Sequence, residues 1–229
     1  MQRPPSETLY VDMGLPSGTL WAVSNLDISS PGKFQPSPYQ YDCSFVSWGN
    51  IDAHNPISDT EFDYDFGGVN AQAPWYEGQV YGSTPGAALT ANIPLSLDVA
   101  RRELGGPWRM PSKEEFSELI ANITFMQADG ITPIPTTTKN KLVTIEGVVG
   151  IYLKSNINGN MLFLACSSGG TGMEWKNPGA GGGYWSTSFE SERNASYLGF
   201  VTNGVYPQLN NYRYYGFAIR PVWNPRDKR

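Results

Sequence analysis

Two helical patterns lie in the middle of this 229-residue chain, with strand patterns on either side of them. The clearer one follows Ser112, which has Glu115 three residues later and so predicts a capping box. Apolar residues then recur at the spacing of one helix face: Phe116, Leu119, Ile120 and Ile123. A shorter helix is expected from a cap at Ser96 to Leu104, where Gly105-Gly106 ends it. Strands must therefore supply most of the regular structure.

Strand patterns precede and follow the helices. Short strands are expected at 9–13 and 20–24, with a tight turn between them at 14–18. Later runs are separated by hairpin signals at 156–159 and at Asn203-Gly204. The later strands are expected at 142–145, 150–154, 161–165, 197–202, 205–209 and 215–222. This order predicts an α+β domain with two helices and mainly antiparallel sheets, in which the N- and C-terminal strands pair.

No linker or repeat divides the chain, so residues 1–229 are expected to form a single domain. Its parts are 1–95 with the first strands, 96–125 with the helices, and 142–223 with the strand-rich remainder. Segment 30–86 is polar, aromatic and rich in Gly and Pro, which favours long irregular loops over the surface. Gly181–Gly183 lacks the Lys-Ser/Thr of a phosphate loop and is interpreted as a flexible turn.

Composition excludes several partners. The net charge is −5 and no Lys/Arg run is present, which argues against nucleic-acid binding. No apolar stretch reaches the ~18 residues that span a bilayer, so no direct membrane insertion is expected. Cys43 and Cys166 either form one long-range disulfide or, as favoured here, remain buried free thiols.

Catalytic patterns are scarce. The single histidine, His54, lies in a loop-like segment, and no nucleophile elbow or zinc motif occurs. Acidic residues alternate at Asp59, Glu61, Asp63 and Asp65. They fit either the solvent face of a strand or a calcium site, and a hydrolase using this acidic cluster is the enzymatic alternative. We expect a protein that is not an enzyme and that has no cofactor and no metal.

The C-terminal region has the composition of a binding surface. Between Arg193 and Arg220 the only charged side chain is Arg213. Six of the thirteen tyrosines and four asparagines fall between 184 and 215: Tyr184, Tyr197, Tyr206, Tyr212, Tyr214, Tyr215, Asn194, Asn203, Asn210 and Asn211. Tyrosine gives large contact area at low rotamer cost, and Asn gives adaptable hydrogen bonds, as in antibody paratopes.

Alternation along the strands assigns faces to these residues. Leu198 and Phe200 are expected to point inward, which sends Tyr197, Gly199 and Val201 outward. On the returning strand, Tyr206 and Gln208 are expected to share one face. Tyr184 is expected in the core, but the consecutive residues 210–215 cannot all face inward.

A family resemblance is carried by motifs that follow in order along the chain. They are Gly14–Ala22 (GLPSGTLWA), Ala100-Arg101, Gly106–Ser112 (GPWRMPS), Glu115-Phe116, Asn158–Asn160 (NGN), Tyr184–Ser186 (YWS) and Arg220–Val222 (RPV). Together they resemble the Fibrobacter succinogenes major paralogous domain, common in gut Bacteroidales and their phages, over nearly the whole chain. The resemblance implies a C-type-lectin-like fold.

The C-terminal part also resembles the variable region of proteins diversified by retroelements. The matching positions are Ser188, Phe189, Ser191, Asn194, Tyr197, Gly199, Tyr206, Gln208, Asn210, Asn211, Tyr212, Tyr214 and Tyr215, and Arg213 among them completes the expected binding set. Such proteins are phage receptor-binding proteins or surface adhesins, and some are trimers. The calcium-sugar motifs of animal lectins are missing, so calcium-dependent sugar binding is not carried over. The paired cysteines of related sulfatase-activating enzymes are missing too.

The resemblance and the residues together predict a non-catalytic display protein. It is expected to bind a protein or glycan on a bacterial surface, from a phage virion or a bacterial cell surface, alone or as a homotrimer or part of a larger assembly. The alternative is a structural subunit of a virion or surface appendage that uses the same face for assembly.

Overall fold

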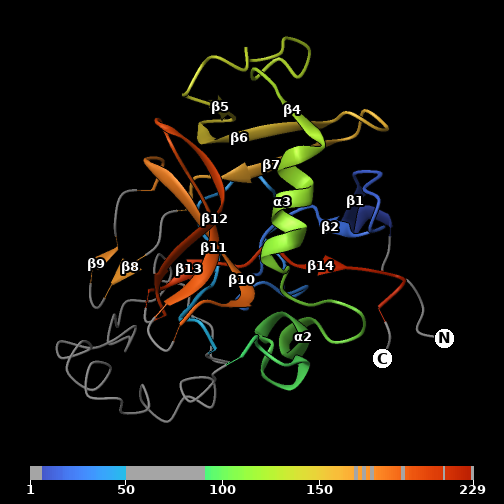
Figure 1. The fold of residues 1–229 in the computed structure, drawn as a ribbon, viewed down its shortest axis with the longest axis vertical. Helices are drawn as coiled ribbons and strands as arrows, with labels where there is room; N and C mark the ends of the chain where they lie inside the picture. The colour runs from blue at the N-terminus through green and yellow to red at the C-terminus, as the bar shows by residue number, and fades with distance from the viewer. Residues whose placement is uncertain are drawn as a thin grey trace.

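The computed structural model describes residues 7–49, 91–167, 170–171, 174–175, 178–191, 194–213 and 215–227. Within these ranges the chain is a mixed α/β structure with two α-helices and three mostly antiparallel sheets (Figure 1). His54, the acidic cluster at 59–65 and Tyr214 lie outside the described residues. The part of segment 30–86 that is described, 30–49, runs as turns and bends up to one short strand.

The helices lie where the sequence places them. They are α2 (Val99–Leu104) and α3 (Lys113–Ala121), preceded by the 3-10 turns η1 (Glu7–Leu9) and η3 (Leu95–Leu97). The Ser96 cap is wrong, because Asp98 caps α2 by accepting the Arg101 N–H at 3.0 Å, while Ser96 lies in η3. Gly105 ends α2 with φ 63°, a conformation that favours glycine.

The capping box of α3 is confirmed. The Ser112 hydroxyl accepts the Glu115 N–H, and the Glu115 carboxylate accepts the Ser112 N–H. Phe116 and Leu119 are fully buried, whereas Ile123 has already entered the next strand. The apolar face of α3 therefore packs into the core, as the spacing predicts.

The two ends of the described chain meet in one sheet. Its strands are β1 (Tyr10–Asp12), β2 (Leu20–Ala22) and β14 (Val222–Trp223), in the order β1-β2-β14 (Figure 1). Val222 pairs with Trp21, which confirms the expected pairing of N- and C-terminal strands. The single strand expected at 215–222 is instead two, β13 (Phe217–Ala218) and β14, with Arg220-Pro221 between them.

A second sheet continues from α3. Its strands are β4 (Ile123–Phe125), β5 (Leu142–Ile145), β6 (Val148–Ser155) and β7 (Met161–Ala165). The other three strands all pair with β6, and all pairs are antiparallel. Strands β5, β6 and β7 and the turn after Ser155 lie where the sequence predicts them.

The third sheet carries the C-terminal region. Its strands are β3 (Phe45–Val46), β10 (Gly181–Phe189), β11 (Asn194–Val201), β12 (Gly204–Tyr212) and β13, in the order β12-β11-β10-β13-β3. A small separate pair joins β8 (Gly170–Thr171) and β9 (Glu174–Trp175). The flexible turn expected at Gly181–Gly183 is wrong, since these glycines begin β10. The β11–β12 hairpin forms, but its loop residues are Thr202 and Asn203, because Val201 pairs with Gly204.

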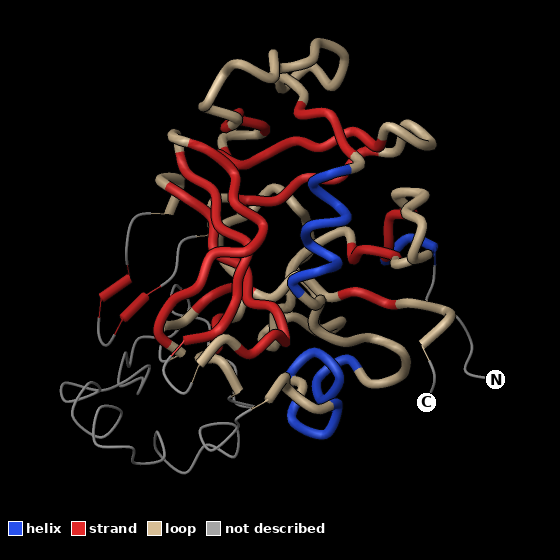
Figure 2. The backbone as a smooth tube through the Cα atoms, in the orientation of Figure 1, coloured by secondary structure: helices blue, strands red, loops and turns tan. Residues whose placement is uncertain are grey.

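The third sheet is packed on both faces. On one face, Tyr184, Leu198 and Phe200 pack in the main core with Trp21 of β2 and Phe116 of α3. On the other, β10 and β13 contribute to a second cluster around Trp48, Trp185, Phe217 and Ile219. Figure 2 shows α3 between this sheet and the sheet of the chain ends.

The cysteines are free thiols and both are fully buried. Burial raises the pKa of each thiol to about 12, so neither is a reactive thiolate at neutral pH. The favoured alternative for Cys43 and Cys166 is confirmed.

A set of polar side chains ties α3 to both chain ends, and we call it the α3 anchor: Thr19, Arg109, Glu115 and Asp227. Arg109 donates to both oxygens of Glu115 at 2.7 and 2.8 Å, and to Asp227 at 2.6 Å. The Thr19 hydroxyl donates to Glu115 at 2.7 Å. The guanidinium and the other hydrogen bonds to the carboxylate hold the pKa of Glu115 below its usual range, against the opposing effect of burial.

Candidate ligand-binding groove

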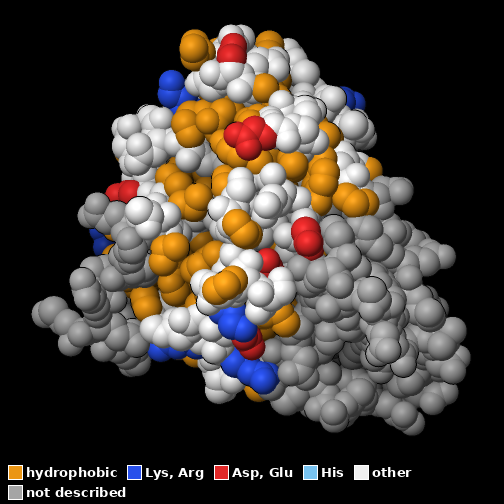
Figure 3. All heavy atoms as spheres, turned by 180° about the vertical axis from the view of Figure 1, so that it is seen from behind, with side chains coloured by type: hydrophobic (Ala, Val, Ile, Leu, Met, Phe, Trp, Pro, Cys, Tyr) orange, Lys and Arg blue, Asp and Glu red, His pale blue; other side chains and the backbone are white. Residues whose placement is uncertain are grey.

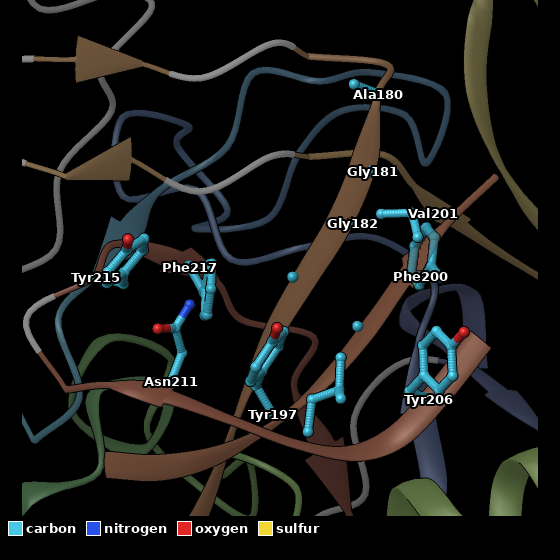
Figure 4. Close-up of a pocket in the computed structure, with 13 residues that line it drawn as sticks. Ala180, Gly181, Gly182, Tyr197, Phe200, Val201, Tyr206, Asn211, Tyr215 and Phe217 are labelled. Carbon is cyan, nitrogen blue, oxygen red and sulfur yellow. The ribbon is translucent and has the colours of Figure 1, made fainter. Parts of the chain in front are cut away.

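An open groove of about 380 Å³ lies on the face of the third sheet that carries Tyr197 (Figure 4). Strands β10, β11, β12 and β13 and the residues next to them form it. Its lining is Ala180, Gly181, Gly182, Gly183, Tyr197, Gly199, Phe200, Val201, Tyr206, Leu209, Asn211, Tyr215 and Phe217. None of these side chains is charged, so the groove is an apolar and amide-bearing surface.

The floor of the groove contains two paired strand glycines, both of which are buried. Gly183 on β10 pairs directly with Gly199 on β11. A Cβ on Gly183 would lie 2.7 Å from the Phe217 ring, and one on Gly199 would lie 2.7 Å from Leu209. The Phe217 and Leu209 side chains therefore pack over the two glycines and exclude any larger residue at either position.

Aromatic rings form one wall. Tyr197 and Phe217 have ring centroids 4.7 Å apart, and Tyr215 lies 5.9 Å from Phe217. Trp185 supports them from the buried side, 4.6 Å from Phe217, and its indole N–H donates to the Val46 carbonyl. Burial, with a smaller effect of Tyr215, raises the pKa of the Tyr197 phenol, so it stays a neutral donor. This wall is rigid because each ring is packed by another.

The opposite wall is more exposed. Val201 and Tyr206 retain 43% and 40% of their accessible surface, and both project beside the groove (Figure 4). The Tyr206 hydroxyl donates to the Asn203 carbonyl at 3.2 Å, which folds the ring back over its own hairpin.

A β-bulge decides which β12 residues reach the groove. Gly199 pairs with Tyr206 but Tyr197 pairs with Leu209, so the register shifts between them. Tyr206 and Leu209 therefore share the groove face. The expectation that Tyr206 and Gln208 share one face is wrong, because the Gln208 amide turns to α3 and donates to the Ser117 hydroxyl at 2.7 Å.

Asn211 is the main polar group of the groove. Its side-chain oxygen accepts the Tyr212 N–H at 2.8 Å, which fixes the amide. The amide nitrogen lies toward Phe217 and Tyr197 (Figure 4). Among the residues that the structure describes, this nitrogen has no hydrogen-bond partner.

The fourteen residues expected to bind ligand separate into groups. Five line the groove: Tyr197, Gly199, Tyr206, Asn211 and Tyr215. Others lie wholly or partly at the surface outside it: Phe189, Ser191, Asn194, Gln208, Asn210 and Tyr212. In this second group, the Asn194 amide donates to Asn210 at 3.0 Å.

Ser188 and Arg213 are not at the surface. Ser188 is 1% exposed, and its hydroxyl accepts the Lys113 N–H at the start of α3. Arg213 is also 1% exposed, with its guanidinium over the Trp48 ring at 4.4 Å. Both side chains support the sheet from within, so we leave them out of the candidate site.

Sequence reasoning missed several groove residues, notably Gly183, Leu209 and Phe217. Leu209 looked like an ordinary core residue, and only the bulge turns it into the groove. The glycine run at 181–183 was a usable signal, because glycine inside a strand often marks close approach of another group.

A second hollow, of about 420 Å³, lies at the sheet of the chain ends. Its polar groups are largely occupied by the chain itself. The Asp12 carbonyl accepts from Asn158 and Asn160, and Arg226 donates to the Pro16 carbonyl at 2.8 Å. Unlike the groove, it contains none of the expected binding residues.

Within the described ranges, no three His, Cys, Asp or Glu residues are placed to hold a metal ion. The alternating acids at 59–65 fall outside those ranges. No helix in the described part is long and apolar enough to cross a membrane. On the face seen from behind, apolar side chains gather in patches with few charged ones among them (Figure 3).

Comparisons with protein-family models, with curated proteins and with solved structures found no match to this chain.

Proposed function

We propose that this chain is a non-catalytic ligand-binding module of C-type-lectin-like fold, and that the groove on its third sheet is the centre of the binding face. The observation that carries the proposal is the groove itself: an uncharged slot with a glycine floor, lined by five residues that sequence reasoning had already singled out. Binding sites of this kind are mostly apolar, with a few placed polar groups.

The mechanism is shape complementarity without covalent chemistry. The packed rings of Tyr197, Tyr215 and Phe217 present a rigid contact surface, and Asn211 supplies a directed hydrogen bond. Aromatic anchors in well-packed pockets contribute most of the energy in such interfaces.

The ligand in this proposal is a protein or glycan on a bacterial surface, and the chain is displayed on a phage virion or on a bacterial cell. Support comes from the sequence resemblance to retroelement-diversified proteins. The placement of Tyr206, Asn210 and Asn211 also supports it, because these side chains can change without disturbing the main core.

Binding of the fluorescently labelled protein to a panel of intact gut Bacteroidales strains tests the proposal. Tyr206→Ala removes an exposed ring from the groove wall, and we expect at least tenfold weaker binding to any strain that the unmodified protein stains. Its stability should change by no more than about 0.5 kcal/mol. Ile131→Ala, which removes a side chain that is 79% exposed on a distant loop, is the matched control and should bind normally.

Equal binding by Tyr206→Ala and the control would contradict the proposal. A stable oligomer in solution that protects Tyr206 from solvent would contradict it too, and would favour the assembly subunit instead.

A further inference from the structure

We propose, building on the proposed function, that the groove receives an uncharged aromatic side chain of a protein ligand, and that Asn211 and Tyr197 bind the main-chain carbonyl beside it.

The absence of charge sets the first condition on the ligand. Every described residue that lines the groove is neutral, and the nearby Arg213 is buried over Trp48. A carboxylate or ammonium group entering the groove would lose its hydration without gaining a counter-charge, which is costly. The occupant is therefore a neutral group.

The shape of the slot sets the second condition. Its floor is the Gly183–Gly199 pair, and packed rings stand on one side with Val201 and Tyr206 on the other. A flat ring can enter between these walls with its edge toward Tyr197 and Phe217, since aromatic rings attract one another at centroid separations of about 4.5–7 Å.

Two hydrogen-bond donors set the third condition. The Asn211 amide nitrogen and the Tyr197 hydroxyl have no partner within the described part of the chain, and both border the groove (Figure 4). The Asn211 oxygen already accepts the Tyr212 N–H. The groove thus offers donors to a ligand that brings an acceptor, and a main-chain carbonyl is such an acceptor.

The hydrogen-bond donors and acceptors of the groove favour a peptide over a sugar as the ligand. Each sugar hydroxyl is a donor as well as an acceptor, so a buried sugar ring needs several acceptors around it. Among the described residues of the lining there is no carboxylate and the one amide oxygen is engaged, so the tyrosine phenols are the only side-chain acceptors left, and this set suits a peptide better than a sugar ring.

The ligand enters through a side chain and does not add a strand. The floor strands β10 and β11 already pair on both sides, β10 with β11 and β13, and β11 with β10 and β12. Their main-chain groups are therefore committed to the ladders, and the groove lies above them.

An NMR titration of the full chain with N-acetyl-L-phenylalaninamide tests the inference. We expect shifts at the amides of Gly183 and Gly199, saturating with a measurable Kd. Asn211→Asp keeps the oxygen that accepts the Tyr212 N–H but replaces the donor with a charge, so binding should weaken at least tenfold. Asn140→Asp makes the same exchange at an exposed position before β5, where the Asn140 oxygen accepts the Leu142 N–H, and should bind as the unmodified protein does.

Three outcomes would overturn the inference. They are shifts caused by methyl N-acetylglucosaminide but not by the aromatic amide, no shift with either probe, or equal binding by both Asp variants. The proposed function is judged separately, because binding to intact cells that depends on Tyr206 can persist in each of these cases.

Discussion

The α3 anchor and the groove are built on opposite principles. In the anchor, short charge-assisted hydrogen bonds join Arg109 to Glu115, six residues later, and to Asp227 near the C-terminal end of the described chain. In the groove no charged group takes part, and rings, glycines and one amide define the surface. The stability of the anchor depends on which charged residues pair, whereas the groove is defined by the shape of its uncharged lining.

Folding and ligand binding therefore depend on different residues. Removing Arg109 or Glu115 breaks the bidentate pair and leaves its mostly buried partner short of counter-charge, so these two residues are not interchangeable with others. Tyr206 and Asn210 contact mainly their own hairpin and the neighbouring strand, so their replacement leaves the anchor intact. A scaffold of this kind can accept change at its binding face without losing its fold.

The largest expected effect is at Glu115. Glu115→Ala leaves the mostly buried Arg109 without its bidentate partner, and we expect the free energy of unfolding to fall by about 3 kcal/mol. Glu114→Ala, at the exposed neighbouring position, should cost no more than about 0.5 kcal/mol. Urea denaturation of both variants measures the difference, and equal losses would remove the distinction between anchor and surface.

A smaller effect is expected from pH. Burial raises the pKa of Asp98 to about 6, above its ordinary value of 3.8, because its hydrogen bonds from Arg101 and Met110 offset only part of the desolvation. The folded state therefore binds the proton more tightly than the unfolded state. This contribution to stability is present below about pH 4 and is lost as pH rises to about 6.

Asp98→Asn should flatten the fall in stability between pH 4 and pH 6, as measured by urea midpoints across that range. An unchanged slope in the variant would show that Asp98 does not titrate there. Below about pH 4.5 the lowered pKa of Glu115 acts in the opposite sense, because protonation of Glu115 weakens the anchor. Ligand binding should not follow either change, since no Asp, Glu or His is among the described residues that line the groove.

Local chemistry made much of the fold predictable. The capping box at Ser112 and Glu115 needs only residues three apart, and it forms as expected. The strands at 142–145 and 161–165 were recognisable from apolar or alternating patterns. The pairing of β2 with β14 was expected from the order of the elements, because strand patterns precede and follow the two helices.

Long-range packing decided what local patterns could not. Arg213 appeared to be a surface cation in an uncharged segment, but Trp48, 165 positions away (213 − 48), covers it. Ser188 appeared to be a variable surface residue, but it meets the start of α3. The bulge in β12 sends Tyr206 and Gln208 to opposite faces of the sheet. The alternation of residues along the strand cannot predict such a shift in register.

The most direct measurement blocks the groove itself. Val201→Cys places a thiol on the exposed groove wall, while the native Cys43 and Cys166 are fully buried and should not react with a maleimide in the folded protein. Ile157→Cys, at a 52% exposed site in the turn after β6, is the control. After coupling a bulky maleimide to each variant, we expect the Val201→Cys conjugate to lose binding to intact cells and the Ile157→Cys conjugate to keep it. Undiminished binding by the conjugate at Val201 would show that the ligand is recognised elsewhere on the molecule.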